Sequence, residues 1–423
     1  MIAKIKSIIT GQTARNVYLV TVGNGLTSLL GFVATIIVSR KLGPVNFGLF
    51  SLAFGVFMTA SKFTDLGLNF ALSRYAAQNA VGRWEPYAKY ALTLKIIITL
   101  VVTVFGIVGS PILAQGVFHN SELTLLFRLS FLALLGIMLL DFYTALSQAL
   151  GKWLPSIWIQ TAASVFKIIG LLALVFLGST TILSSYAIYL ISPLIGAACG
   201  ALLISRKFLG PVSVDKAHRQ KILGFSVWMG VGVLVAAVTS NLDIFIVGNK
   251  LPALDVGLYA AASRFSQVAT IITASLGTVL SIRAASFTES RHVKPFLKKT
   301  LLLGLFIFIG ALIVWPLAGP LITLTVGESF VGSVTIFKIL LVAVSIGAAR
   351  SAISANFFSL EKPQYFAFSS IFSAVMLLVV NHYLIPIFGA LGAAYTNLIN
   401  NILLLVFSLV FIKISLAKKS VLL

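Results

Sequence analysis

The chain has 423 residues, of which 59% are hydrophobic and only 10% are charged, and its mean hydropathy is +1.06. A soluble domain carries roughly 25% charged residues, so this composition excludes a water-soluble fold. Lysine and arginine total 31 against 10 acidic residues, which gives a formal net charge of +21. The single cysteine, Cys199, excludes an internal disulfide and a cysteine metal cluster.

Apolar runs recur along the whole chain, each about 20 residues long, which is the length a helix needs to cross a bilayer. They predict an all-α polytopic membrane protein with about twelve transmembrane helices, because barrel strands would alternate over shorter stretches. The first six are expected near residues 17–38, 47–66, 91–113, 123–146, 157–177 and 182–204. The second six are expected near residues 225–247, 256–280, 301–324, 334–358, 365–385 and 391–412.

A weak internal repeat divides the chain near its middle. Residues 41–50 (KLGPVNFGLF) align without gaps on residues 250–259 (KLPALDVGLY), with lysine, leucine, glycine and leucine in register. Each copy follows the first span of its half. Parallel repeats of this kind are typical of transporters that have a substrate path between two similar halves. We therefore expect two six-helix bundles around a central cavity, residues 1–210 and residues 211–423.

Basic residues are unevenly distributed between the expected loops. Most lie in loops on the same side as the two termini, whereas the outer loops hold Arg40, Lys41 and Lys250. Cytoplasmic loops of membrane proteins carry this excess of lysine and arginine. The distribution predicts a multi-pass membrane protein with both termini in the cytoplasm. It also accounts for most of the net charge without a nucleic-acid partner.

Charged residues inside the spans are informative, because a charge at the bilayer centre costs about 2.5–3.5 kcal/mol. The basic ones, within or at the ends of spans, are Lys62, Lys95, Arg128, Lys167, Arg264, Arg283, Lys338 and Arg350. The acidic ones are Asp65, Asp141 and Asp243. The membrane interior therefore carries an excess of positive charge, which favours a wet cavity.

The position of each charge within its span suggests different roles. Lys95, Arg283 and Lys338 lie near predicted span ends, where a long side chain can extend its charge to the interface. Lys62 and Asp65 are three residues apart, so one interpretation is a pair on a single helix face. The leading cavity cations are Arg264, Lys167, Arg350 and Arg128.

Amides and hydroxyls share spans with some of these charges. The amides of interest are Asn24 in the first span, Gln267 in the eighth, and Asn397, Asn400 and Asn401 in the twelfth. Such side chains often only join helices, and that interpretation stays open for each of them. Several together favour a hydrated path.

Motifs of several enzyme classes are absent from the sequence. It contains no G-x-x-x-x-G-K-[ST] run for nucleotide hydrolysis and no H-E-x-x-H zinc motif, and its four histidines are scattered. No expected outer loop is long enough for a catalytic domain. We therefore expect a transporter rather than an enzyme, with no metal and no cofactor.

Several segments in order along the chain resemble polysaccharide flippases of the Wzx type. In the first half they are Asn24, residues 39–44 (SRKLGP), 47–50 (FGLF), 65–68 (DLGL) and 74–77 (RYAA). In the second half they are residues 242–243 (LD), 256–259 (VGLY), 261–262 (AA), 264–265 (RF) and 386–394 (PIFGALGAA). Each motif is loose, but together they cover essentially the whole chain.

The resemblance implies the superfamily of MATE-like multidrug, oligosaccharidyl-lipid and polysaccharide exporters, which alternate access through a cavity between two bundles. It implies that the substrate is an undecaprenyl-pyrophosphate-linked oligosaccharide, with bilayer lipids and polysaccharide assembly proteins as partners. Arg264 resembles the cavity arginine of lipid II flippases, although that branch commonly has two further helices. The residues expected to hold the pyrophosphate are Arg264, Lys167, Arg350, Arg128 and Lys62, and those expected to meet sugar are Asn24, Asn397, Asn400, Asn401 and Gln267.

Two other functions stay open at this point. One is export of soluble drugs or metabolites, although organic cations would favour an acidic cavity rather than a basic one. The other is a structural or regulatory membrane protein, which leaves the charges inside the spans unexplained. Asp65, Asp141 and Asp243 are candidates for proton or sodium coupling, or simply partners of nearby bases.

Overall fold

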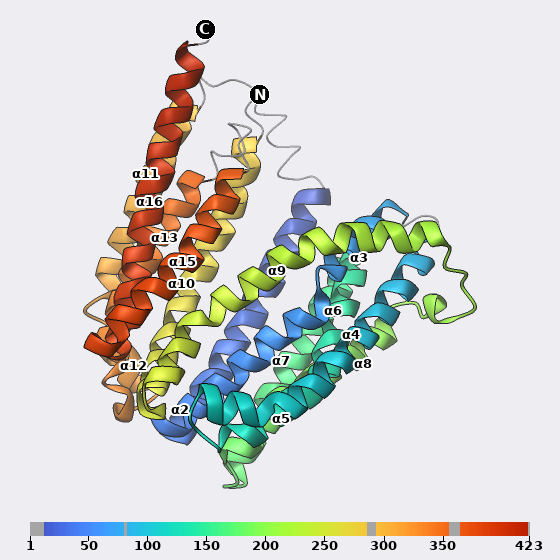
Figure 1. The fold of residues 1–423 in the computed structure, drawn as a ribbon, viewed down its shortest axis with the longest axis horizontal. Helices are drawn as coiled ribbons and strands as arrows, with labels where there is room; N and C mark the ends of the chain where they lie inside the picture. The colour runs from blue at the N-terminus through green and yellow to red at the C-terminus, as the bar shows by residue number, and fades with distance from the viewer. Residues whose placement is uncertain (1–11, 80–82, 286–292, 355–363, 422–423) are drawn as a thin grey trace. The chain divides into compact units, whose positions relative to one another are not determined.

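The computed structural model describes residues 12–79, 83–285, 293–354 and 364–421 (Figure 1). These described residues are mostly helical and include no strand. The all-α polytopic membrane fold expected from the apolar runs is therefore confirmed.

The chain forms two compact units, and neither is one continuous piece of sequence. The first contains the residues up to Leu42 together with Leu49–Asn241, and the second contains Gly43–Gly48 together with the residues from Leu242 onward. Two long helices therefore contribute residues to both units.

Helices of the first unit pack around a core rich in aromatic side chains, including Trp84, Phe142 and Phe208. Its elements are α2 (Gln12–Asp65), α3 (Leu68–Gln78), α4 (Glu85–Pro111), η1 (Ile112–Val117), α5 (Leu123–Leu132), α6 (Leu134–Ala149), α7 (Trp153–Phe176), α8 (Ile182–Leu203), η2 (Lys207–Leu209) and the first part of α9 (Lys216–Lys250). In this unit α6 packs against α3, α4, α7 and α8.

The second unit is built around α13, which packs against α10, α11 and α16, while α15 packs against α16. Its elements are the end of α9, α10 (Ala253–Ala285), α11 (Val293–Val314), α12 (Ala318–Thr325), η4 (Glu328–Phe330), α13 (Ser333–Ser354), α15 (Gln364–Phe388) and α16 (Ala390–Val421).

Eight helices in the described part of the chain are long and apolar enough to cross a membrane, or up to ten when two bent pairs are each counted as one span. The expected number of twelve is therefore not confirmed. One difference is that α2 is counted once although it contains two expected spans. The two parts of α2 are separated by a kink at Gly43, whose φ of 68° leaves the helical region, directly before Pro44. Residues 355–358 of the expected tenth span lie outside the described residues.

Two expected spans are bent helix pairs rather than straight helices. The span expected at 123–146 consists of α5 and α6, which meet at 41°. The span expected at 301–324 consists of the end of α11 and α12, which meet at 62°. Pro316 follows the end of α11, and a proline cannot donate the backbone hydrogen bond that would continue the helix.

Large apolar side chains cover much of the outer surface. Phe105, Val108 and Phe176 are 74%, 72% and 88% exposed. In water so large an apolar surface would drive association, whereas hydrocarbon is a favourable neighbour for it. The exposure of these apolar side chains is therefore typical of a protein surrounded by lipid.

The two copies of the sequence repeat meet inside the second unit. A Cβ atom on Gly48 would lie 2.0 Å from the carbonyl oxygen of Ala253, and one on Gly257 would lie 1.9 Å from that of Pro44. Gly48 is equivalent to Gly257 in the repeat, and Pro44 to Ala253. The contact is therefore reciprocal, and glycine recurs at these positions because each backbone lies too close to the other for any side chain.

Candidate functional site

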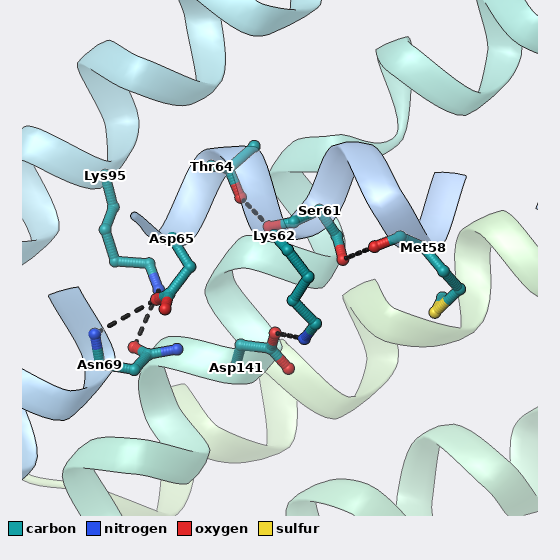
Figure 2. A network of polar contacts seen from close by, with 8 residues as sticks. All are labelled: Met58, Ser61, Lys62, Thr64, Asp65, Asn69, Lys95 and Asp141. Atoms are coloured by element: carbon teal, nitrogen blue, oxygen red, sulfur yellow. Dashed lines mark hydrogen bonds and ion pairs between the residues drawn. The ribbon is translucent and has the colours of Figure 1, made fainter. Parts of the chain in front are cut away.

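The last turns of α2 carry two ion pairs that point to different neighbouring helices (Figure 2). Lys62 faces Asp141 of α6, and Asp65 faces Lys95 of α4. The hydroxyls of this segment bond back into their own helix, since Thr64 donates to the carbonyl oxygen of Ser61. One helix end thus presents a cation to one side and an anion to the other.

The pair between Lys95 and Asp65 is buried. Lys95 Nζ lies 2.8 Å from Asp65 Oδ1 and 2.8 Å from Asn69 Oδ1, and the side chains of Lys95 and Asp65 are only 1% and 8% exposed. The backbone N–H of Asn69 also donates to Asp65 Oδ1, across the break at Leu66 and Gly67. Removing one partner of such a pair costs about 3–5 kcal/mol, because a charge stays buried without compensation.

This geometry corrects two interpretations of the sequence. Lys95 was expected to extend to the interface, but it is buried against Asp65. Pairing of Lys62 with Asp65 on one helix face is also wrong, because each of the two bonds to a different helix. The physical reason is tertiary: α4 and α6 bring opposite charges to the two sides of α2, and the pair with α4 is buried together.

The pair between Lys62 and Asp141 is looser and more exposed. Lys62 Nζ lies 3.4 Å from Asp141 Oδ2, and the two side chains are 44% and 26% exposed. One turn earlier on α2, Thr59 accepts a hydrogen bond from Asn241 at 3.1 Å. Residues three apart share a helix face, so Thr59 with its partner Asn241 and Lys62 with its partner Asp141 define a polar strip on α2.

Lys167 and Arg128 differ in their surroundings. Lys167 Nζ lies 4.6 Å from the centre of the Tyr189 ring, a cation–π contact between α7 and α8. Such a contact stabilises the ammonium without cancelling its charge. The side chain of Arg128 on α5 is exposed. The structure does not bring Arg128 to the polar strip of Lys62 by any contact between described residues.

In the second unit, amide and phenol groups surround a carboxylate. Asn381 donates to Asp243 Oδ1 at 2.9 Å, Asn397 donates to Asp243 Oδ2 at 2.7 Å, and the hydroxyl of Tyr259 also bonds to Asp243. The Oδ1 atom of Asn381 is buried and has no hydrogen-bond partner among the described residues. Four helices, α9, α10, α15 and α16, thus meet at one carboxylate.

The cations of the second unit lie apart from this carboxylate in sequence and in their contacts. Arg264 Nη1 donates to Gln267 Oε1 at 3.1 Å along α10. Arg350 on α13 is partly buried, and its Nε atom has no hydrogen-bond partner in the described part of the chain. Lys338 Nζ lies 5.9 Å from the Trp315 ring. The side chain of Arg283 lies outside the described side chains.

The asparagines expected to meet sugar fall into different settings. Asn24 is exposed on α2, whereas Asn397 bonds to Asp243 and Asn400 donates to Ser373 at 2.9 Å. Asn401 donates to the carbonyl oxygen of Asn397 at 3.0 Å. Asn397 and Asn400 thus join α16 to neighbouring helices, which the sequence left open as an alternative, whereas the bond of Asn401 stays within α16.

Sequence reasoning did not single out four of the residues in these clusters. They are Thr59, Asn69, Asn241 and Asn381. Asn381 could have been found, since it is the one amide in the span expected at 365–385. Among the described residues, no group of three or more histidine, cysteine, aspartate or glutamate side chains could hold a metal ion.

Comparison of the sequence with known proteins found a matching family and a relative. Residues 13–281 match the family described as "Polysaccharide biosynthesis protein". A Shigella flexneri protein named "Putative O-antigen transporter" is 24% identical over 381 residues, which cover 86% of this chain and 88% of that protein.

Two solved structures share the fold. A structure titled "Lipid II flippase MurJ, inward closed conformation" superimposes with a TM-score of 0.76 at 13% identity and covers 94% of this chain and 87% of the other. An inward-facing multidrug resistance MATE family transporter of the MOP superfamily has a TM-score of 0.73 at 15% identity, with 92% and 95% of the two chains covered. The fold is thus that of transporters with two helical lobes, and the chain belongs to the polysaccharide biosynthesis protein family.

Proposed function

We propose that the protein moves a lipid-linked oligosaccharide, an O-antigen or other surface polysaccharide unit on undecaprenyl pyrophosphate, from the cytoplasmic to the periplasmic leaflet. The observation that carries the proposal is the set of charged side chains that are kept partly exposed inside spans of a polysaccharide biosynthesis protein. Lys62, Lys167 and Arg264 are such cations. The names of two similar proteins, one for O-antigen transport and one for flipping lipid II, support the same class of substrate.

The physical problem is the polar head group. Each unpaired hydroxyl or amide costs about 2–7 kcal/mol in hydrocarbon, and a charge costs far more. A strip of hydroxyl, amide and ammonium groups, such as Thr59, Asn241 and Lys62, offers replacement partners for sugar and phosphate. The polyprenyl tail can stay in the bilayer, so only the head group needs this path.

The pyrophosphate is common to all cargoes of this kind, and it is the group that cations hold best. We assign it to Arg264, Lys167, Lys62, Arg350 and Arg128, and we assign the sugar to Asn24, Gln267 and the amides of α16. Transport by alternating access, with both termini in the cytoplasm of a bacterial cell and assembly enzymes as neighbours, belongs to the same proposal. An inside-negative potential favours outward movement of a negative head group.

The test uses proteoliposomes that contain the purified protein and a fluorescent undecaprenyl-pyrophosphate oligosaccharide. A membrane-impermeant quencher reports how much label changes leaflet. We expect protein-dependent flipping that Arg264→Ala slows by about tenfold or more, since a hydrogen bond to a charged group is worth about 1.5–3 kcal/mol. Arg264→Lys should retain part of the rate.

The matched control is Lys152→Ala, which removes one exposed positive charge from a loop outside the spans. It should flip at the wild-type rate. Absence of flipping with several oligosaccharides and an imposed gradient would reject the lipid-linked substrate and favour export of soluble compounds. Normal flipping by Arg264→Ala would reject only the assignment of that residue.

A further inference from the structure

We infer that Asp141 determines specificity by competing for Lys62, so that a multiply charged pyrophosphate can displace it and the singly charged phosphates of bilayer lipids cannot. The inference rests on the proposed function, because it concerns how the same path selects its substrate. It gives Asp141 a different role from the ion coupling that the sequence left open.

The contrast between the two ion pairs of α2 shows which one can exchange partners. Lys95 and Asp65 are buried, 2.8 Å apart, and share a third partner in Asn69. Lys62 and Asp141 are 3.4 Å apart, and their side chains are 44% and 26% exposed. An exposed pair with a long contact contributes little stability, so opening it costs little. The buried pair is therefore structural, and the exposed pair is replaceable.

The ammonium of Lys62 has capacity for a second ligand. It carries three N–H donors, and within the described residues Asp141 Oδ2 is the acceptor found for it. One turn earlier on α2, the hydroxyl of Thr59 accepts a hydrogen bond from the amide of Asn241 on α9. A phosphate that reached Lys62 could therefore bind its other N–H donors before it replaces Asp141.

Without Asp141, Lys62 would bind the phosphates of ordinary phospholipids. Anionic phospholipids surround the protein in great excess over any lipid-linked oligosaccharide, and each presents a singly charged phosphate diester. Lys62 without a counter-ion would be occupied by them. With Asp141 in place, an incoming anion must outcompete a carboxylate that is already positioned, and Coulomb attraction favours the pyrophosphate because it carries more charge.

The experiment measures flipping of the fluorescent undecaprenyl-pyrophosphate oligosaccharide in phosphatidylcholine vesicles without and with phosphatidylglycerol. Wild-type flipping should change little when phosphatidylglycerol is added. Asp141→Asn should become sensitive, with flipping lowered about fivefold by phosphatidylglycerol, which corresponds to about 1 kcal/mol. Asp141→Glu, which keeps the charge, should remain insensitive.

Two further variants identify the cause. Lys62→Met in the Asp141→Asn background should abolish the sensitivity to phosphatidylglycerol, because the cation that binds the competing lipid is gone. Asp65→Asn, the same change in the buried pair, should lower thermal stability and should lower flipping equally in both lipid mixtures.

The outcomes separate the two proposals. A wild-type protein that flips, together with Asp141→Asn that is as insensitive to phosphatidylglycerol as wild type, overturns the role of Asp141 and leaves the proposed function standing. Sensitivity that persists without Lys62 overturns it as well. A wild-type protein that flips in neither mixture overturns the proposed function and this inference with it.

Discussion

Lys95 and Asp65 form a 2.8 Å ion pair that joins α4 to the end of α2, and their side chains are 1% and 8% exposed. Asn69, at the start of α3, bonds to both of them. Three helix segments therefore meet at one pair of charges, directly beside the break at Leu66 and Gly67. Lys62, one of the cations that face substrate in our proposal, lies on the same helix end, so this pair helps to fix its position.

Lys95→Met should lower the free energy of unfolding by about 3–5 kcal/mol, because Asp65 would be left buried and uncompensated. Asp65→Asn combined with Lys95→Met should recover part of this loss, since both charges are then removed. Unfolding of the purified protein in detergent, by heat or denaturant, measures both effects. A single variant that unfolds at the wild-type temperature would contradict a structural role for the pair.

Gly48→Ala and Gly257→Ala should each destabilise the protein by about 1–3 kcal/mol, because inserted atoms in a close contact force the backbone to shift. The added Cβ would lie 2.0 Å from Ala253 and 1.9 Å from Pro44, respectively. Gly310 in α11 is the matched control, since a Cβ there meets nothing within 4 Å. Gly310→Ala should be neutral or slightly stabilising. The comparison is made by thermal unfolding, and equal melting temperatures for all three variants would contradict it.

Asp243→Asn should remove the response of flipping to an imposed ion gradient. The change replaces a carboxylate held by Asn381, Asn397 and Tyr259 with a neutral amide of the same size. Flipping is measured in proteoliposomes with a proton or a sodium gradient and without one. A variant that responds to gradients like the wild type would show that Asp243 only joins helices.

Lys167→Met should slow flipping while the fold is retained, because the ammonium over Tyr189 supplies charge rather than packing. Lys167→Arg should keep most of the rate, since a guanidinium also stacks on an aromatic ring. Tyr189→Phe is a further control that preserves the ring. The flipping assay and a melting curve together separate loss of function from loss of fold. Unchanged flipping by Lys167→Met would remove Lys167 from the proposed path.

The orientation in the membrane is testable with single cysteines, because Cys199 is the one native cysteine and can be replaced by serine. In that background Ser179→Cys and Ser213→Cys lie in neighbouring loops and are both exposed. The positive-inside rule predicts that a membrane-impermeant maleimide added to intact cells labels Ser179→Cys and does not label Ser213→Cys. The reverse pattern would place both termini outside.

The membrane fold was predictable because it depends on composition along the chain. A run of about 20 apolar residues must become a helix in lipid, where every backbone polar group needs a partner within its own segment. Alignment of the internal repeat made Gly48 and Gly257 equivalent, but their reciprocal contact could be seen only once both backbones were placed.

The partners of the charges were not predictable in the same way. From spacing alone we predicted that Lys62 pairs with Asp65 and that Lys95 extends to the interface. Spacing along the chain gives only the distances between residues of the same helix, so it could not show partners on other helices. Asp243 was visible as a charge inside a span, but Asn381, far from it in sequence, was not visible as its partner.

The sequence by itself thus determined that this chain is a helical membrane protein, which residues carry charge into the bilayer, and which family it resembles, because hydropathy and motifs are properties of single segments. Tertiary structure alone decided which charges are buried together and which stay exposed. The cost of desolvation is the physical reason, because a charge can be buried only where another helix brings a partner to it. This is why Lys95 is buried in a structural pair while Lys62, one helix turn away from Asp65, stays partly exposed.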